Sequence, residues 1–115
     1  PAKIAREILG SEKVIGRSTH CLKDIKNASD ERCDYIGIGP IFPSQTKKKL
    51  NPIGIDYLRQ GLDKVLLPAF AIGGINSSNI HDLKQINDLR IAVSDAIINS
   101  DDPFAKTQEL FKFLT

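Results

Sequence analysis

Apolar residues along this chain follow two alternating patterns, one typical of helices and one typical of buried strands. Helical spacing, with apolar residues three or four positions apart, predicts helices over residues 2–9, 22–28 and 53–62, and a last helix from Pro103 to about Leu114. Another helix, with Ile80, Leu83 and Ile86 on its apolar face, is predicted after N-cap candidates at 76–79. Short apolar runs that end at small or polar residues predict strands over residues 13–16, 35–38, 68–72 and 89–93. The pattern therefore predicts an opening helix followed by four strand–helix units.

Alternating strands and helices with short connections are typical of an α/β fold with a parallel sheet. Four such units are half of a (β/α)8 barrel, and a chain of 115 residues is too short to close one, because a barrel needs at least about 200. Three architectures stay open: part of a barrel, a half-barrel that pairs with a second chain, or a small open sheet. The opening helix, which no strand precedes, favours a chain whose first half is missing.

Composition sets bounds on the class of protein. We expect residues 1–115 to form a single domain. The 16 basic and 14 acidic residues give a net charge of +2 and are interspersed, so only the three lysines at 47–49 resemble a basic stripe for nucleic acid. No apolar run approaches the ~20 residues that span a bilayer. Cys21 and Cys33 lack the spacing of a zinc site or a disulfide framework. We therefore expect a cytoplasmic protein with two reduced thiols and no membrane or nucleic-acid partner.

Three of the predicted strands end at groups that suit phosphate. The strand at 35–38 runs through Gly39 into a loop with hydroxyl, amide and lysine side chains at 44–49, and the strand at 68–72 ends at Gly73 and Gly74. The strand at 89–93 ends at Ser94. The carboxyl ends of parallel strands lie on one edge, where glycines let backbone N–H groups approach a ligand. The sequence therefore predicts a shared phosphate site at this edge.

Four segments together resemble the carboxyl-terminal half of thiamine-phosphate synthase, and the resemblance covers essentially the whole chain. They are GRSTH at residues 16–20, DYIGIGPIFPSQTK at 34–47, AIGGI at 71–75 and IAVSDAI at 91–97. The resemblance implies a (β/α)8 barrel, of which this chain is the C-terminal half. It also implies condensation of hydroxymethylpyrimidine diphosphate with thiazole phosphate to give thiamine phosphate and diphosphate. Catalysis then depends on stabilising charge on the departing diphosphate.

The resemblance assigns catalytic roles to three residues by position. Lys47 would meet the diphosphate as a point charge, and Ser18 would lie near the pyrimidine diphosphate. His20 is the third candidate, because the related thiazole tautomerase is similar in its Ser-x-His segment and uses this histidine in proton transfer. A tautomerase-like isomerase is therefore the alternative enzyme, although the loop at 43–47 favours the synthase.

The substrate-binding candidates lie in the loop after the second strand and at the last two strand ends. Ser44 and Thr46 would flank the thiazole-phosphate side. The backbone N–H groups of Gly74, Val93 and Ser94 would hold the thiazole phosphate. This assignment agrees with the interpretation of the strand ends made without the family.

Mg²⁺ is the cofactor that the family implies, and the family's ligands for it all precede the first residue here. Asp34 is expected at the opposite edge of the sheet, and Asp95 alone does not make a magnesium cage. We therefore expect no metal site and no condensation by this chain alone. A second class of hypothesis is a non-catalytic, phosphate-binding half-barrel that pairs with a partner chain, as a homo-oligomer or with a missing N-terminal half.

Overall fold

A computed structural model describes residues 2–43 and 51–114. The strands β1 (Gly16–Thr19), β2 (Tyr35–Ile38), β3 (Ala69–Ile72) and β4 (Arg90–Ala92) form one parallel sheet in sequential order. The helices are α1 (Ala2–Leu9), α2 (Leu22–Asp30), α3 (Gly54–Lys64), α4 (Asp95–Ile98) and α5 (Pro103–Phe111), with a 3-10 turn η1 (Ile80–Leu83). The predicted α/β class and parallel sheet are confirmed.

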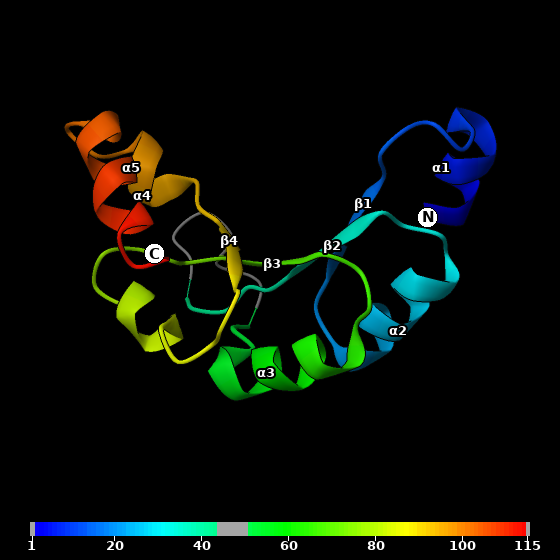
Figure 1. The fold of residues 1–115 in the computed structure, drawn as a ribbon, viewed down its shortest axis with the longest axis horizontal. Helices are drawn as coiled ribbons and strands as arrows, with labels where there is room; N and C mark the ends of the chain where they lie inside the picture. Colours follow the sequence, from blue (N-terminus) through cyan, green and yellow to red (C-terminus); the bar gives the residue numbers. More distant parts are fainter. Residues whose placement is uncertain (1, 44–50, 115) are drawn as a thin grey trace.

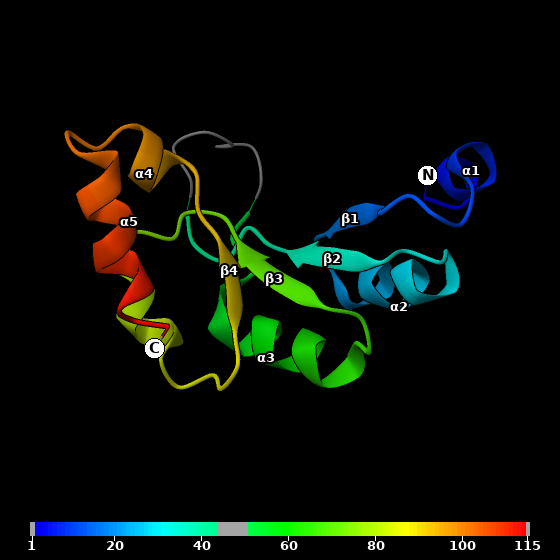
Figure 2. The ribbon, with the colours of Figure 1, turned by 45° about the horizontal axis from the view of Figure 1, so that its top comes forward.

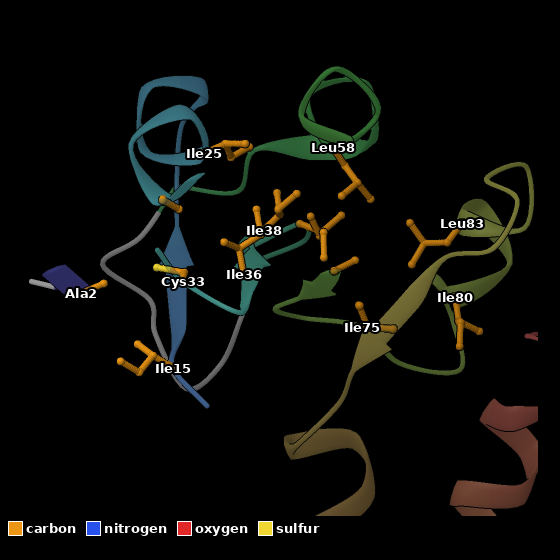
Figure 3. Packing of buried hydrophobic residues seen from close by; sticks show 14 of the residues in the cluster. Ala2, Ile15, Ile25, Cys33, Ile36, Ile38, Leu58, Ile75, Ile80 and Leu83 are labelled. Carbon is orange, nitrogen blue, oxygen red and sulfur yellow. The ribbon is translucent and has the colours of Figure 1, made fainter. Parts of the chain in front are cut away.

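The sheet is covered on one face only within the described residues. Helices α2 and α3 lie across that face, whereas α1 and the α4–α5 pair lie beyond the two ends of the sheet (Figures 1 and 2). Ile25 of α2 and Leu58 of α3 point toward Ile36 and Ile38 of β2 (Figure 3). All four side chains are at most 1% exposed, so they form the centre of the core.

The opposite face of the sheet carries apolar side chains that no described helix covers. Alternation along the strands places Tyr35 and Phe70 on this face, with their rings edge to face at a centroid distance of 5.7 Å. Tyr35 is 40% exposed and Ile72 is 44% exposed. Parallel sheets normally bury both faces, so we expect further protein to pack against the apolar side chains of this open face.

The helices at the two ends of the sheet also expose apolar side chains. The sequence predicts an apolar face on α1 and on α5, but in α5 only Leu110 is buried. The exposed large apolar residues of these helices and of the segment that follows α5 are Ile4, Ile8, Leu9, Ile98, Phe104, Phe111 and Leu114. Burying one such side chain is worth about 1.5–3 kcal/mol, and the described chain leaves that free energy unused.

The first strand lies three residues later than the sequence predicts. The apolar run at 13–16 suggests a strand there, but the sheet pairs Gly16–Thr19 with β2. The polar residues of β1 have partners that the apolar pattern does not reveal. Arg17 binds Glu31 at 2.6 Å, and the hydroxyl of Thr19 donates to the Gly37 carbonyl at 2.8 Å. Ser18 therefore lies within the strand.

The prediction of a full helix carrying Ile80, Leu83 and Ile86 is also wrong, since only the 3-10 turn η1 forms there. Side chains before it compete for backbone groups: the Asn76 Oδ1 accepts from the Ser78 N–H at 2.8 Å, and the Asn79 Oδ1 accepts from the Asn76 N–H at 2.9 Å. Asp88, with φ of 55°, turns the chain before β4. The short helix α4 was not predicted, because four residues are too few for a periodic pattern.

Both cysteines are free thiols, as the spacing predicts. Cys33 is buried, and burial raises the pKa of its thiol. Among the described residues, no helix has the length and apolar character that crossing a membrane requires.

A buried arginine ties the opening helix to the amino edge of the sheet. Arg6 is 7% exposed, and its guanidinium donates to the carbonyls of Gly10, Lys13 and Arg32. It also donates to the Asp34 carboxylate at 2.7 Å, and the same oxygen accepts from the Ile15 N–H. One side chain thus satisfies acceptors from separate segments of the chain.

We predict that Arg6→Lys lowers the free energy of unfolding by about 1–3 kcal/mol, because an ammonium cannot reproduce the planar fork and leaves carbonyl acceptors unsatisfied. Urea unfolding measures the change, with Lys3→Arg on an exposed position of the same helix as control. An Arg6→Lys variant with wild-type stability would show that the network contributes nothing.

The Asp34 carboxylate also predicts a pH dependence of stability. The Ile15 N–H and then the Arg6 guanidinium lower the pKa of Asp34. A lowered pKa stabilises the fold above the ordinary carboxyl value of about 3.9, and this stabilisation is lost as pH falls through the folded-state value. Chemical unfolding at a series of pH values should therefore show a steeper loss below about pH 4 in the wild type than in Asp34→Asn. Identical profiles would contradict the assignment.

Candidate functional site

The carboxyl ends of all four strands meet at one edge of the sheet (Figure 2). Thr19 pairs with Ile38 on β1 and β2, and Ile72 pairs with Ala92 on β3 and β4. The residues that follow these pairs therefore continue side by side. This register brings the Gly73–Gly74 pair next to the residues after β4.

Gly73 and Gly74 adopt backbone conformations that side chains disfavour, with φ of 103° and 69°. They are also crowded by the chain that leaves β2. A Cβ on Gly73 would lie 2.5 Å from the Cα of Pro40, and one on Gly74 would lie 2.7 Å from the carbonyl oxygen of Phe42. Both positions therefore require glycine for conformation and for space.

Hydrogen bonds hold the chain after β2 against the end of β3. The Ile41 N–H donates to the Ile72 carbonyl at 3.0 Å, and the Phe42 N–H donates to the Gly73 carbonyl at 3.1 Å. Ile41 is 1% exposed and anchors this segment in the core. The carbonyl groups at the end of β3 are thus occupied.

Two backbone donors at this edge have no such partners. Within residues 2–43 and 51–114, the N–H groups of Gly74 and Ser94 form no hydrogen bond. Ser94 precedes α4, and its carbonyl accepts from the Ile97 and Ile98 N–H groups, while its hydroxyl makes no capping bond. Neighbouring strand ends therefore present free donors, an arrangement that suits an oxyanion.

His20 directly follows β1 and is held on two sides. Its N–H donates to the Asp24 carboxylate at 3.0 Å, and this bond is the main reason for a lowered pKa of Asp24. Its Nδ1 lies 2.7 Å from the Gly39 carbonyl oxygen. Because a carbonyl only accepts, Nδ1 carries the proton, and the Nε2 of a neutral ring is an acceptor.

The other residues that the sequence predicts for the site lie in different parts of the chain. Val93 lies between β4 and Ser94, and Ser18 is an exposed residue of β1 that pairs in register with Gly37. The strand order separates Ser18 and His20 from β4 by two strands. The predicted Ser44, Thr46 and Lys47 lie outside the described residues.

The described residues do not form a site for the implied Mg²⁺. Among them, no group of three or more histidine, cysteine, aspartate or glutamate side chains is placed to hold a metal. Asp34 lies at the amino edge, where it binds Arg6, and the Asp95 carboxylate accepts a hydrogen bond from Asn99. The carboxylates of both aspartates thus already bind other side chains of the protein.

Two pockets lie away from the strand-end donors. One of about 280 Å³ is beside the amino end of β4, between Leu89, Ile80 and Phe113. The other, of about 450 Å³, lies between the α4–α5 connection and Glu109. Neither of these two pockets is lined by Gly74 or Ser94.

Sequence reasoning missed the role of one polar residue near the site. Asn79 Nδ2 donates to the Gly74 carbonyl at 2.8 Å. The sequence shows asparagines at positions 76 and 79, and asparagine is a residue type whose side chain often binds nearby backbone groups. It does not indicate which backbone group they bind.

Comparisons with known proteins give a family for this chain. The family model described as thiamine monophosphate synthase (TMP-TENI) matches residues 1–97. A thiamine-phosphate synthase from Prochlorococcus marinus is 46% identical over 96% of this chain. One from Dictyoglomus turgidum is 39% identical over 99% of it. The chain spans 32% and 52% of the length of these two relatives.

Solved structures extend the similarity to the fold. A thiamine phosphate pyrophosphorylase from Pyrococcus furiosus superposes with a TM-score of 0.88 at 32% identity. The match covers 99% of this chain and 54% of that one. A chain of the Amycolatopsis orientalis BexX/CysO complex shares the fold at a TM-score of 0.74 and 13% identity. On the match of residues 1–97 and on these relatives, the chain belongs to the thiamine monophosphate synthase family.

Proposed function

We propose that this chain supplies the thiazole-phosphate-binding half of a thiamine-phosphate synthase. The observation that carries the proposal is the pair of free N–H groups, of Gly74 and Ser94, on neighbouring strand ends of the described chain. Backbone donors fixed in this way bind phosphate oxygens without supplying a competing carboxylate. The N–H of Val93, which directly precedes Ser94, is the third proposed donor.

The proposed reaction is condensation of hydroxymethylpyrimidine diphosphate with thiazole phosphate, releasing diphosphate. Charge grows on the departing diphosphate, so fixed cations and donors stabilise the transition state more than a general base would. Lys47 is proposed to meet this charge, with Ser18 on the diphosphate side. Ser44 and Thr46 are proposed to contact the thiazole phosphate. Because the described residues form no metal site, further residues would be needed for the whole reaction to proceed.

We infer that the sheet is half of a (β/α)8 barrel. The open face with Tyr35 and Ile72, and the free edges of β1 and β4 in the described chain, support this architecture. The superposition on 54% of the Pyrococcus furiosus chain supports it independently. Further parallel strands, from a segment beyond these 115 residues or from another chain, would cover the open face and the apolar helix surfaces.

A tautomerase-like isomerase remains the alternative only through His20. The Nδ1 of this histidine is held by the Gly39 carbonyl, and this leaves Nε2 as the one ring nitrogen open to substrate. The arrangement fits proton transfer, but it fits orientation of a substrate group equally well. No observation favours the isomerase over the synthase.

Calorimetric titration of the chain with thiazole phosphate tests the proposal. Gly74→Ala should abolish saturable binding, because the new methyl group would meet the Phe42 carbonyl and displace the donor. Gly10→Ala is a matched control, since Gly10 also has a positive φ, of 81°, but nothing lies within 4 Å of its Cβ position. Each substitution carries a conformational cost of about 1–3 kcal/mol, so binding is compared on samples shown to be folded.

Equal binding by the wild type and Gly74→Ala would contradict the proposed phosphate site. Absence of binding by a folded wild-type chain would also contradict the proposal that this chain alone forms the phosphate site. Loss of binding in both glycine variants would indicate a general effect on folding and would withdraw support from the site.

The role proposed for Lys47 is tested in a complete synthase that contains these residues. Lys47→Ala should lower kcat by about 100-fold or more, because the cation is needed most when the diphosphate departs. Lys49→Ala is the control for loss of charge in the same loop. Steady-state kinetics measures both, and unchanged turnover in Lys47→Ala would exclude the role.

A further inference from the structure

The side chain of Asn79 links two backbone groups of the loop that follows β3. Its Nδ2 donates to the Gly74 carbonyl at 2.8 Å, and its Oδ1 accepts from the Asn76 N–H at 2.9 Å. The Asn76 Nδ2 also reaches the Gly74 carbonyl, at the longer distance of 3.4 Å. Both polar ends of the Asn79 amide are thus used, and the strong bond to Gly74 comes from Asn79.

This bond decides which way the peptide group after Gly74 faces. Gly74 has no side chain to limit its rotation, and its φ of 69° lies in a region that glycine enters and leaves freely. The Gly74–Ile75 peptide is trans and planar, so its N–H, which belongs to Ile75, points opposite to the Gly74 carbonyl that Asn79 holds. The Gly74 N–H belongs to the preceding peptide group, and its direction is limited through the backbone of Gly74. Ile75 itself is 4% exposed, and this anchors the next residue of the loop in the core.

The direction of a carbonyl matters at an anion site. A carbonyl oxygen turned toward phosphate would place two negative atoms together, whereas an N–H in that place attracts the anion. Among the described residues, the amide of Asn79 is the only short hydrogen-bond partner of the Gly74 carbonyl. Without it, the two-glycine turn would sample other orientations and lose part of its order before a ligand binds.

We propose that Asn79 is a positioning residue for phosphate, which holds the Gly74 carbonyl away from the anion and so presents the N–H groups of this turn. The inference rests on the proposed function, since it needs phosphate to bind at Gly74. Asn79 contacts the backbone and not the ligand. Its effect is therefore on the affinity for the phosphate group and on the response of the amide groups on either side of the Gly74 carbon, those of Gly74 and Ile75.

Two variants separate this role from general support of the loop. Asn79→Ala removes both bonds. Asn79→Asp keeps the oxygen that accepts from the Asn76 N–H but replaces the donor to Gly74 by a carboxylate oxygen, which repels the carbonyl. Asn87→Ala is the matched control, because Asn87 is exposed and lies before β4, at the other edge of the sheet.

The experiment is a titration of the full chain with inorganic phosphate, followed by the amide signals of Gly74 and Ser94 in ¹H–¹⁵N NMR spectra. In the wild type and in Asn87→Ala, both signals should shift and saturate together. In Asn79→Asp and Asn79→Ala, the apparent dissociation constant should rise about 3- to 10-fold, the effect of losing one hydrogen bond. The phosphate-induced shift should also shrink more at Gly74 than at Ser94. Thermal unfolding of each variant reports any loss of stability separately.

Wild-type affinity and a wild-type Gly74 shift in Asn79→Asp would overturn the role of Asn79 and leave the phosphate site intact. A wild-type chain whose Gly74 and Ser94 signals ignore phosphate would overturn the site and the inference together. Equal weakening in Asn79→Asp and Asn87→Ala would also contradict the inference, because the effect would then not depend on the bond to Gly74.

Discussion

The close approach of the chain after β2 to the end of β3 is the constraint on which the candidate site depends. The Ile41 and Phe42 N–H groups bind the carbonyls of Ile72 and Gly73, and this pairing leaves no room for a side chain at Gly73 or Gly74. The same pairing uses up carbonyl acceptors at the edge. What the edge then presents is backbone donors, and the chemistry proposed for the protein follows from that imbalance.

The second organising feature is the one-sided cover of the sheet. Helices α2 and α3 bury the face with Ile36 and Ile38, while the face with Tyr35 and Ile72 stays open in the described chain. A parallel sheet open on one face is uncommon, and both end helices also expose apolar side chains. The exposed apolar surfaces and the candidate phosphate site thus follow from one proposed architecture. In it, the chain is half of a barrel and carries half of the substrate-binding site.

Sequence reasoning found the strands that consist of a short apolar run. The clearest case is β2, whose bounds of Tyr35–Ile38 are those predicted. It misplaced β1, whose polar residues are satisfied by Glu31 and by a carbonyl of β2, because such partners are distant in sequence. The glycine pair and Ser94 were predicted as a phosphate site from the strand ends alone, and the family resemblance specified thiazole phosphate as the ligand. The Asn79 bond and the Arg6 network could not be predicted, since each depends on the path of the folded backbone.

A crystal structure of the chain with thiazole phosphate would test the central claim most directly. The account predicts phosphate oxygens within hydrogen-bonding distance, about 2.7–3.2 Å, of the N–H groups of Gly74 and Ser94. Phosphate seated instead in the pocket beside Leu89, or at the amino edge near Arg6, would contradict the assignment of this strand edge as the binding site.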